Sequence, residues 1–254
     1  IPEEESGPEN HVVLTDYSCE MAGGLKRGKA VLRACGKTFL FRALMTLVRE
    51  LEKRVTMHAG ASMESYSHRE NVYLDKNGIM LDCSRNSVLN VETIKKYIRL
   101  QASLGMNTMM LYTEDTYEVD NQPYFGHLRG RYSQKELMEI DAYARSKGVE
   151  LIPCIQALAH LNAIMRWPQY RDMSDCDDIL CIGDDRVYQL LEDIFATLDR
   201  CFTSRTVNIG MDEAYMLGLG RYRERNGYPD RTAIFLSHLN KVAAIGEKYG
   251  FTLC

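Results

Sequence analysis

Two adjacent carboxylates, Asp212 and Glu213, are the side chains of this sequence best suited to acid–base chemistry. They follow the short run Thr206-Val207-Asn208-Ile209 and a glycine, a pattern typical of a strand that opens into a loop. Adjacent acids can take different roles on one substrate, because their repulsion favours a state in which only one is ionised. The same dipeptide also occurs at helix starts, where it only complements the helix dipole. The pair is therefore a candidate site without an assigned reaction.

Three further candidates follow other apolar runs. His160 comes after the run at residues 151–155, and Glu114 and Asp115 come directly after the run at residues 109–112. If these runs are parallel strands, their carboxyl ends meet at one edge, where active sites of α/β folds lie. A single His after an apolar run is also compatible with an ordinary hydrogen-bonded core or loop residue.

The elements that must position these side chains alternate between strands and helices from Gly78 onward. Strong helix signals include a capping box at Ser133 and Glu136, and glycines that end three of the helices. The pattern predicts helices over residues 91–104, 133–147, 184–201 and 231–249, and strands over 107–112, 150–155, 206–209 and 251–254. The expected fold class is α/β with a parallel sheet, and both a (β/α) barrel and a doubly wound sheet fit this alternation.

The N-terminal part has a different pattern. Residues 11–14 and 29–35 are predicted strands, and residues 38–53 are a predicted helix. Its expected apolar face consists of Leu40, Phe41, Leu44, Leu47, Val48 and Leu51. The polar segment 62–71 is expected to be a linker. We therefore predict a small α+β domain over residues 1–74 and a second domain over residues 75–254.

Composition excludes some classes of protein. The chain has 254 residues and a formal net charge of -4, so it lacks the basic surface that nucleic acids require. No apolar run approaches the length of a membrane span. Eight cysteines without a Cys-x-x-Cys pair favour a reducing compartment, hence a cytoplasmic location. The chain opens without Met, so we expect a cropped N-terminus, and a preceding signal peptide stays open.

Other polar groups have weaker patterns. His58, Glu64, His68 and Glu70 do not match the spacing of a known metal motif. A cluster of acids lacks the offsets of a calcium loop and is expected to cap the following turn; it comprises Asp172, Asp175, Asp177 and Asp178. Tyr112, Tyr117 and Trp167 are each compatible with sugar stacking and with a place in the core or wall.

Four ordered motifs resemble glycoside hydrolase family 20, the β-N-acetylhexosaminidases. Asn208-Ile209-Gly210-Met211-Asp212-Glu213 resembles the His-x-Gly-x-Asp-Glu signature of that family. Gly78-Ile79-Met80-Leu81-Asp82, Met110-Leu111-Tyr112-Thr113-Glu114-Asp115 and Leu151-Ile152-Pro153-Cys154-Ile155 resemble its first three barrel strands. The resemblance implies a (β/α)8 TIM-type barrel. Only four strand–helix units and the start of a fifth strand are present, so the expected barrel is truncated.

The resemblance implies a glycoside hydrolase that removes terminal β-linked N-acetylglucosamine or N-acetylgalactosamine with retention and without a cofactor or metal. The substrate's own acetamido oxygen is the nucleophile. By resemblance, Glu213 is the general acid and base and Asp212 orients the acetamido group. His160 supports the acid and is paired with a carboxylate from the second strand, for which we favour Asp115 over Glu114.

Two positions depart from the family pattern. Asn208 stands where the signature usually has His, and Asn77 stands where Arg often grips sugar hydroxyls, with Arg85 as an unsupported substitute. These departures leave open a noncatalytic carbohydrate-binding protein with the same fold. A metal-dependent barrel hydrolase is a second alternative. The expected partner is an N-acetylhexosamine-containing glycan or glycoside, while homo-oligomerisation and the activity of this piece alone stay open.

Overall fold

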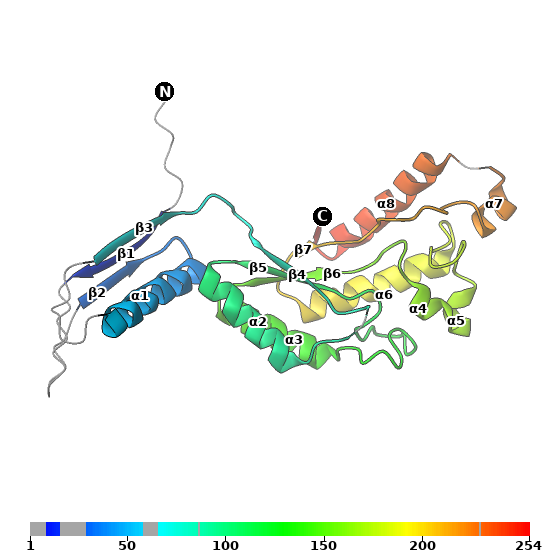
Figure 1. Cartoon of the computed structure of the whole chain (residues 1–254). Coiled ribbons are helices and arrows are strands. Elements are labelled where there is room, and N and C mark those ends of the chain that lie inside the picture. Colours follow the sequence, from blue (N-terminus) through cyan, green and yellow to red (C-terminus); the bar gives the residue numbers. More distant parts are fainter. Residues whose placement is uncertain (1–8, 16–28, 58–65, 86, 229) are drawn as a thin grey trace, which may run out of the picture. The chain divides into compact units, whose positions relative to one another are not determined.

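A computed structural model of the chain describes residues 9–15, 29–57, 66–85, 87–228 and 230–254 (Figure 1). The chain divides into two compact units. The first contains residues 1–78, 96–108 and 145–149, and the second contains residues 79–95, 109–144 and 150–254. The first unit also includes two segments from much later in the chain, so this division does not test the predicted boundary near residue 75.

The first unit contains an antiparallel sheet of order β2-β1-β3, formed by β1 (Glu9–Thr15), β2 (Lys29–Arg33) and β3 (Tyr66–Asn71). Val12 pairs with Leu32 on one side and with His68 on the other. The predicted strands at 11–14 and 29–35 are confirmed. The predicted linker is wrong over Tyr66–Asn71, which is a strand, while residues 62–65 lie outside the described residues.

Helix α1 (Lys37–Met57) confirms the predicted helix and extends beyond it. Its buried face consists of Ala43 and Leu47, which pack with Leu32 and Leu51. Leu40 and Leu44 are 45% and 42% exposed, so the expected apolar face is wrong at these two positions. The buried side chains recur every four residues, which is the stripe that one helix face presents to a sheet.

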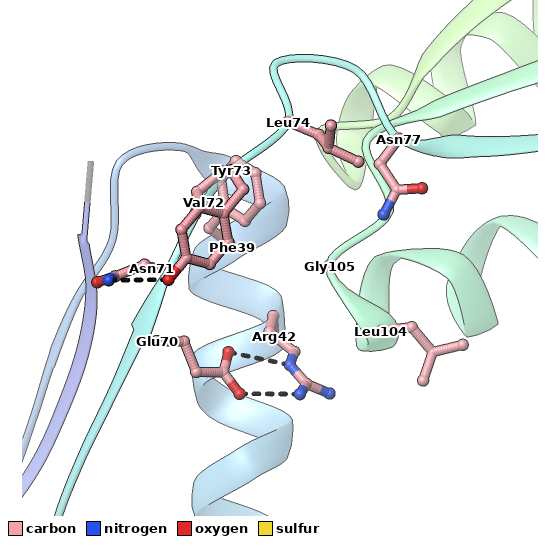
Figure 2. Close-up of a pocket in the computed structure, with 10 residues that line it drawn as sticks. All are labelled: Phe39, Arg42, Glu70, Asn71, Val72, Tyr73, Leu74, Asn77, Leu104 and Gly105. Atoms are coloured by element: carbon pink, nitrogen blue, oxygen red, sulfur yellow. Dashed lines mark hydrogen bonds and ion pairs between the residues drawn. The ribbon is translucent and has the colours of Figure 1, made fainter. Parts of the chain in front are cut away.

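Charged residues hold β3 in the first unit. Arg42 of α1 donates two hydrogen bonds to Glu70 of β3, at 3.2 and 2.8 Å (Figure 2). His68 Nε2 lies 3.0 Å from the same carboxylate. Burial acts to raise the pKa of Glu70, but the bonds from Arg42 and His68 outweigh it and lower the pKa. This pairing stabilises a strand that contains almost no apolar residues. Of the residues considered for a metal motif, His58 and Glu64 lie outside the described residues.

The second unit contains most of the alternating strands and helices. Strands β4 (Gly78–Asp82), β5 (Thr108–Tyr112) and β6 (Glu150–Cys154) form a sheet in chain order. A parallel bridge joins Cys154 to Asn208, directly after β7 (Thr206–Val207), which pairs in parallel with β8 (Thr252–Leu253). The predicted α/β class with parallel strands is confirmed, and no closed barrel is present within the described ranges.

The long helices begin and end where local signals predict. They are α2 (Val91–Leu104), α3 (Gln134–Ser146), α6 (Asp185–Cys201) and α8 (Arg231–Lys248). The capping box before α3 is confirmed, since Ser133 N donates to Glu136 and Glu136 N donates to Ser133. Asp184 and Asp230 cap α6 and α8. The remaining short helices are α4 (Asn162–Met165), α5 (Pro168–Arg171) and α7 (Arg221–Asn226).

The core of the second unit is built from apolar strands and helix faces. Its most buried side chains include Tyr117, Phe125, Phe195, Met109, Leu111, Leu151 and Ile152. A smaller cluster under the loops after β6 and β7 contains Leu158, Ala159, Ile179, Ile182, Leu217 and Ile234. These loops are therefore packed structures with buried apolar contacts. Among the described helices, none has both the length and the apolar content needed to cross a bilayer.

Candidate active site

The adjacent acids Asp212 and Glu213 lie on the loop after β7. Extended backbone continues to Asn208, whose carbonyl accepts from Ile155 N at 2.9 Å. Gly210 then turns with a φ of +50°, and a Cβ at this position would collide with the Ile155 carbonyl oxygen. The backbone therefore requires glycine at this turn, which leads directly into the acidic pair.

His160, on the loop after β6, meets both acids. Its Nε2 lies 3.6 Å from Asp212 Oδ2 and 3.5 Å from Glu213 Oε2, within ion-pair reach but not hydrogen-bonded to either. The acid side chains are 63% and 56% exposed, whereas that of His160 is 16% exposed. The carboxylates are thus accessible to a substrate, with the imidazole behind them.

Glu114 follows β5 and lies in a network of polar side chains. Its carboxylate accepts from Tyr112 Oη at 3.1 Å, and Gln156 donates to the same phenol oxygen at 3.0 Å. Arg85 and Arg129 lie 3.9 and 4.0 Å from Glu114. Burial raises the pKa of Glu114, although Tyr112, Arg85 and His160 each act to lower it.

Asp115 has a different partner from the one that the sequence favours. Its Oδ1 accepts from Arg129 Nε at 3.1 Å, and Arg129 also donates to the Ser84 carbonyl at 2.6 Å. The other oxygen, Oδ2, is buried and has no hydrogen-bond partner among the described residues. Burial raises the pKa of Asp115 despite the guanidinium. Asp115 is therefore paired with Arg129, and its expected place as the carboxylate beside His160 stays a prediction.

Three of the six non-glycine residues with positive φ among the described residues are candidate site residues. Glu114, His160 and Glu213 have φ values of 43°, 57° and 54°, in the left-handed region that non-glycine residues seldom occupy. Each follows a different strand. Such conformations persist only where surrounding contacts enforce them, and they concentrate at functional sites.

Two hollows border the acidic pair. Asp212 lines one of about 430 Å³ together with Tyr112, Gln156 and Asn208. Glu213 lines another of about 270 Å³ together with His160, Asp177, Asp178, Tyr215 and Met216. The acids are therefore neighbours in sequence that border different cavities.

Other predicted candidates have mainly structural contacts. Asn208 accepts from Gly210 N at 3.1 Å and so braces the turn before the acids. Tyr117 is 2% exposed and packs against Phe125, while Trp167 packs against Tyr124 and His127.

Arg85 and Asn77, the two positions considered for contacts with sugar hydroxyls, both have partners within the chain. Arg85 stacks 4.8 Å from the Tyr112 ring centroid and pairs with Asp82. Asn77 belongs to the first unit, where its carbonyl accepts from Asn107 N at 2.8 Å. Sequence reasoning did not assign Arg129, Gln156 or Asp178 to the site. Arg129 lies on an irregular loop, Gln156 follows the third family-like strand without a predicted role, and Asp178 was expected only to cap a turn. Within the described part of the chain, no group of His, Cys, Asp and Glu could hold a metal ion.

Comparison with curated proteins shows a distant likeness. Hexosaminidase D of Homo sapiens is 25% identical over 166 residues, which cover 61% of this chain and 33% of that protein. Beta-hexosaminidase of Porphyromonas gingivalis is 26% identical over 207 residues, covering 68% of this chain and 26% of that protein. The chain therefore spans about a third or less of the length of these curated relatives.

Solved structures show the same fold. A beta-N-acetylhexosaminidase crystal structure matches with a TM-score of 0.78 and 19% identity, covering 100% of this chain and 58% of its own. The GH20 beta-N-acetylhexosaminidase from Streptomyces coelicolor A3(2) matches with a TM-score of 0.73 and 22% identity, covering 100% and 52%. The model of the glycosyl hydrolase family 20 catalytic domain matches residues 76–226. Because that match covers more than half of the chain, the chain belongs to glycosyl hydrolase family 20.

Proposed function

We propose that the protein containing this chain is a retaining exo-β-N-acetylhexosaminidase with a (β/α)8 barrel. It would remove terminal β-linked N-acetylglucosamine or N-acetylgalactosamine. The observation that carries the proposal is the convergence of Asp212, Glu213 and His160, with the imidazole 3.5–3.6 Å from both acids. A solved GH20 enzyme from Vibrio harveyi is described in complex with N-acetylglucosamine, which supports a hexosamine ligand for the family.

Each acid has a distinct role in the proposed mechanism. Glu213 donates a proton to the glycosidic oxygen as the bond to the anomeric carbon breaks. The substrate's acetamido oxygen attacks that carbon, and Asp212 orients the acetamido group and stabilises its developing positive charge. Water then attacks the anomeric carbon and displaces the acetamido oxygen, and Glu213 accepts a proton from this water, which restores the protonated acid.

His160 positions Glu213 and interacts with its carboxylate. His160 lies within ion-pair reach of Glu213 and donates its backbone N–H to Asp178 at 3.1 Å, which fixes the loop. Once Glu213 has lost its proton, the His160 Nε2 lies close enough to stabilise the carboxylate. Glu114, when ionised, also interacts electrostatically with the imidazole.

Substitution of the acid tests the proposal. Glu213→Gln in the full-length protein is expected to reduce release of an aryl alcohol from an aryl β-N-acetylglucosaminide by roughly 10²–10⁴-fold, since amide cannot donate the proton. Glu224→Gln, on the exposed surface of α7, removes the same charge and should leave turnover unchanged. The measurement is kcat by continuous release of the aryl group.

Asn208 favours one rival, a noncatalytic carbohydrate-binding protein, because this residue replaces the titratable His of the signature. That rival predicts saturable binding of N-acetylglucosamine without release of the aryl group by the parent protein. Full turnover by Glu213→Gln would also refute the proposed role of this acid.

A further inference from the structure

The smaller hollow beside the acidic pair has no role in the mechanism described so far. Glu213 and His160 line it, but Asp212 does not, because Asp212 lines the larger hollow. If Asp212 orients the acetamido group, the sugar that is cleaved off occupies the larger hollow. The glycosidic oxygen must contact Glu213, so the group beyond that oxygen must extend toward the side where Glu213 faces the smaller hollow.

Hydrogen bonds join the two loops that line the smaller hollow. Asp175 is 5% exposed, and its carboxylate accepts from Gly218 N at 2.6 Å and from Tyr222 N at 2.7 Å. The Asp175 carbonyl also accepts from Arg221 N at 3.0 Å, and Cys176 Sγ donates to the Met216 carbonyl at 3.1 Å. The loop after β6 and the loop after β7 are thus joined at several points. The hollow between them is a built feature of the fold.

The lining of this hollow combines acids with an accessible aromatic ring. Asp177, Asp178 and Glu213 supply carboxylates, and Tyr215 is 71% exposed. Aromatic faces and carboxylates together suit the C–H faces and hydroxyl groups of a sugar, and carboxylates also attract an ammonium group. An anionic group would meet repulsion from Asp177 and Asp178.

We propose that this hollow is the leaving-group subsite, with Tyr215 as its stacking surface and Asp177 as its charge filter. It accepts a neutral or amine-bearing sugar and disfavours a leaving group that bears a carboxylate or sulfate. This assignment rests on the proposed function, because it uses Glu213 as the proton donor.

Three disaccharides test the charge preference. Each has β1,4-linked N-acetylglucosamine as the sugar to be released, and the second sugar is N-acetylglucosamine, glucosamine or glucuronate. With the full-length protein, we expect kcat/KM to be at least about fivefold higher for the glucosamine compound than for the glucuronate compound at low ionic strength. Asp177→Asn should reduce this ratio. Asp185→Asn should not, because Asp185 is an exposed acid that does not line the hollow.

The ring is tested separately from the charge. Tyr215→Ala should raise KM for all three disaccharides while Tyr215→Phe retains the parent value, since stacking requires the ring and not the hydroxyl.

Equal kcat/KM for the glucosamine and glucuronate compounds, or a ratio unchanged by Asp177→Asn, would overturn the subsite while leaving the hydrolase proposal intact. If the aryl glycoside is not hydrolysed, calorimetric titration with the same disaccharides still tests the assignment. Equal affinities would refute it, and weaker binding of the glucuronate compound would support it.

Discussion

Glu114 is the residue where burial and charge oppose each other most directly. Its side chain is 13% exposed, and it lies near Arg85 and Arg129 and accepts from Tyr112. Burial and then the nearby Glu114 charge raise the pKa of the Tyr112 phenol, so Tyr112 stays protonated and can donate. Even with these partners, burial raises the pKa of Glu114 above its ordinary value of 4.5. Holding this acid ionised in the folded protein therefore has a free-energy cost.

This cost predicts a pH-dependent effect of Glu114→Gln on stability. The native state binds more protons than the unfolded state between the ordinary and the raised pKa, so the contribution of Glu114 to stability falls as the pH rises through this window. The neutral amide avoids the penalty. We expect the variant's unfolding temperature, relative to the parent, to be higher at pH 7 than at pH 4. Glu247→Gln, at an exposed position, should show no such trend, and a relative change in the opposite direction would contradict the reasoning.

The element that most directly supports the candidate site is the loop after β7, held through Asp175. Asp175→Ala would leave the buried amide of Gly218 and the half-buried amide of Tyr222 without their acceptor. Each unpaired amide costs about 1–3 kcal/mol, so a large fall in the free energy of unfolding by denaturant is expected. Asp172→Ala removes an exposed ion pair with Arg221 from the same loop and should cost at most about 1 kcal/mol. Equal effects of the two substitutions would show that Asp175 does not hold the loop.

The difference between predicted and observed elements follows from which interactions are local. Helices such as α2 and α3 have capping residues, terminal glycines and an apolar stripe, all of which are visible within a short window. Strand β3 has no such local signals. It is stabilised by residues distant in sequence, through its pairing with β1 and the contact between Glu70 and Arg42. Tertiary contacts of this kind override a weak local preference.

The candidate site follows the same rule. Asp212, Glu213 and His160 were predictable because each follows an apolar run that ends at one edge of the strands. The partner of Asp115 was not, since Arg129 lies on an irregular loop 14 residues later in the chain. Asp178 likewise reaches the backbone of His160 from 18 residues away. Loop residues are positioned by contacts that no spacing rule encodes.

At the scale of the whole molecule, the first compact unit includes chain segments from both sides of residue 75. It takes in residues 96–108 and 145–149 in addition to residues 1–78. Within this unit, Thr38 of α1 is 3% exposed and donates a hydrogen bond to the Gly148 carbonyl. Within this unit the N-terminal segment therefore satisfies a backbone carbonyl of a later segment.

Removal of residues 1–74 is expected to destabilise the rest of the chain. The lost contacts include the bond from Thr38, and at this chain length each kcal/mol lost lowers the unfolding temperature by roughly 2–4 °C. Thr38→Val in the intact chain isolates that bond and should cost about 0.5–1.5 kcal/mol. Thr46→Val is the matched control, since among the described residues the Thr46 hydroxyl bonds only to the Arg42 carbonyl of its own helix. If the shortened chain unfolds at the same temperature as the intact one, the segments 96–108 and 145–149 do not depend on the N-terminal residues. The contacts within the first unit would then contribute nothing measurable to the stability of those segments.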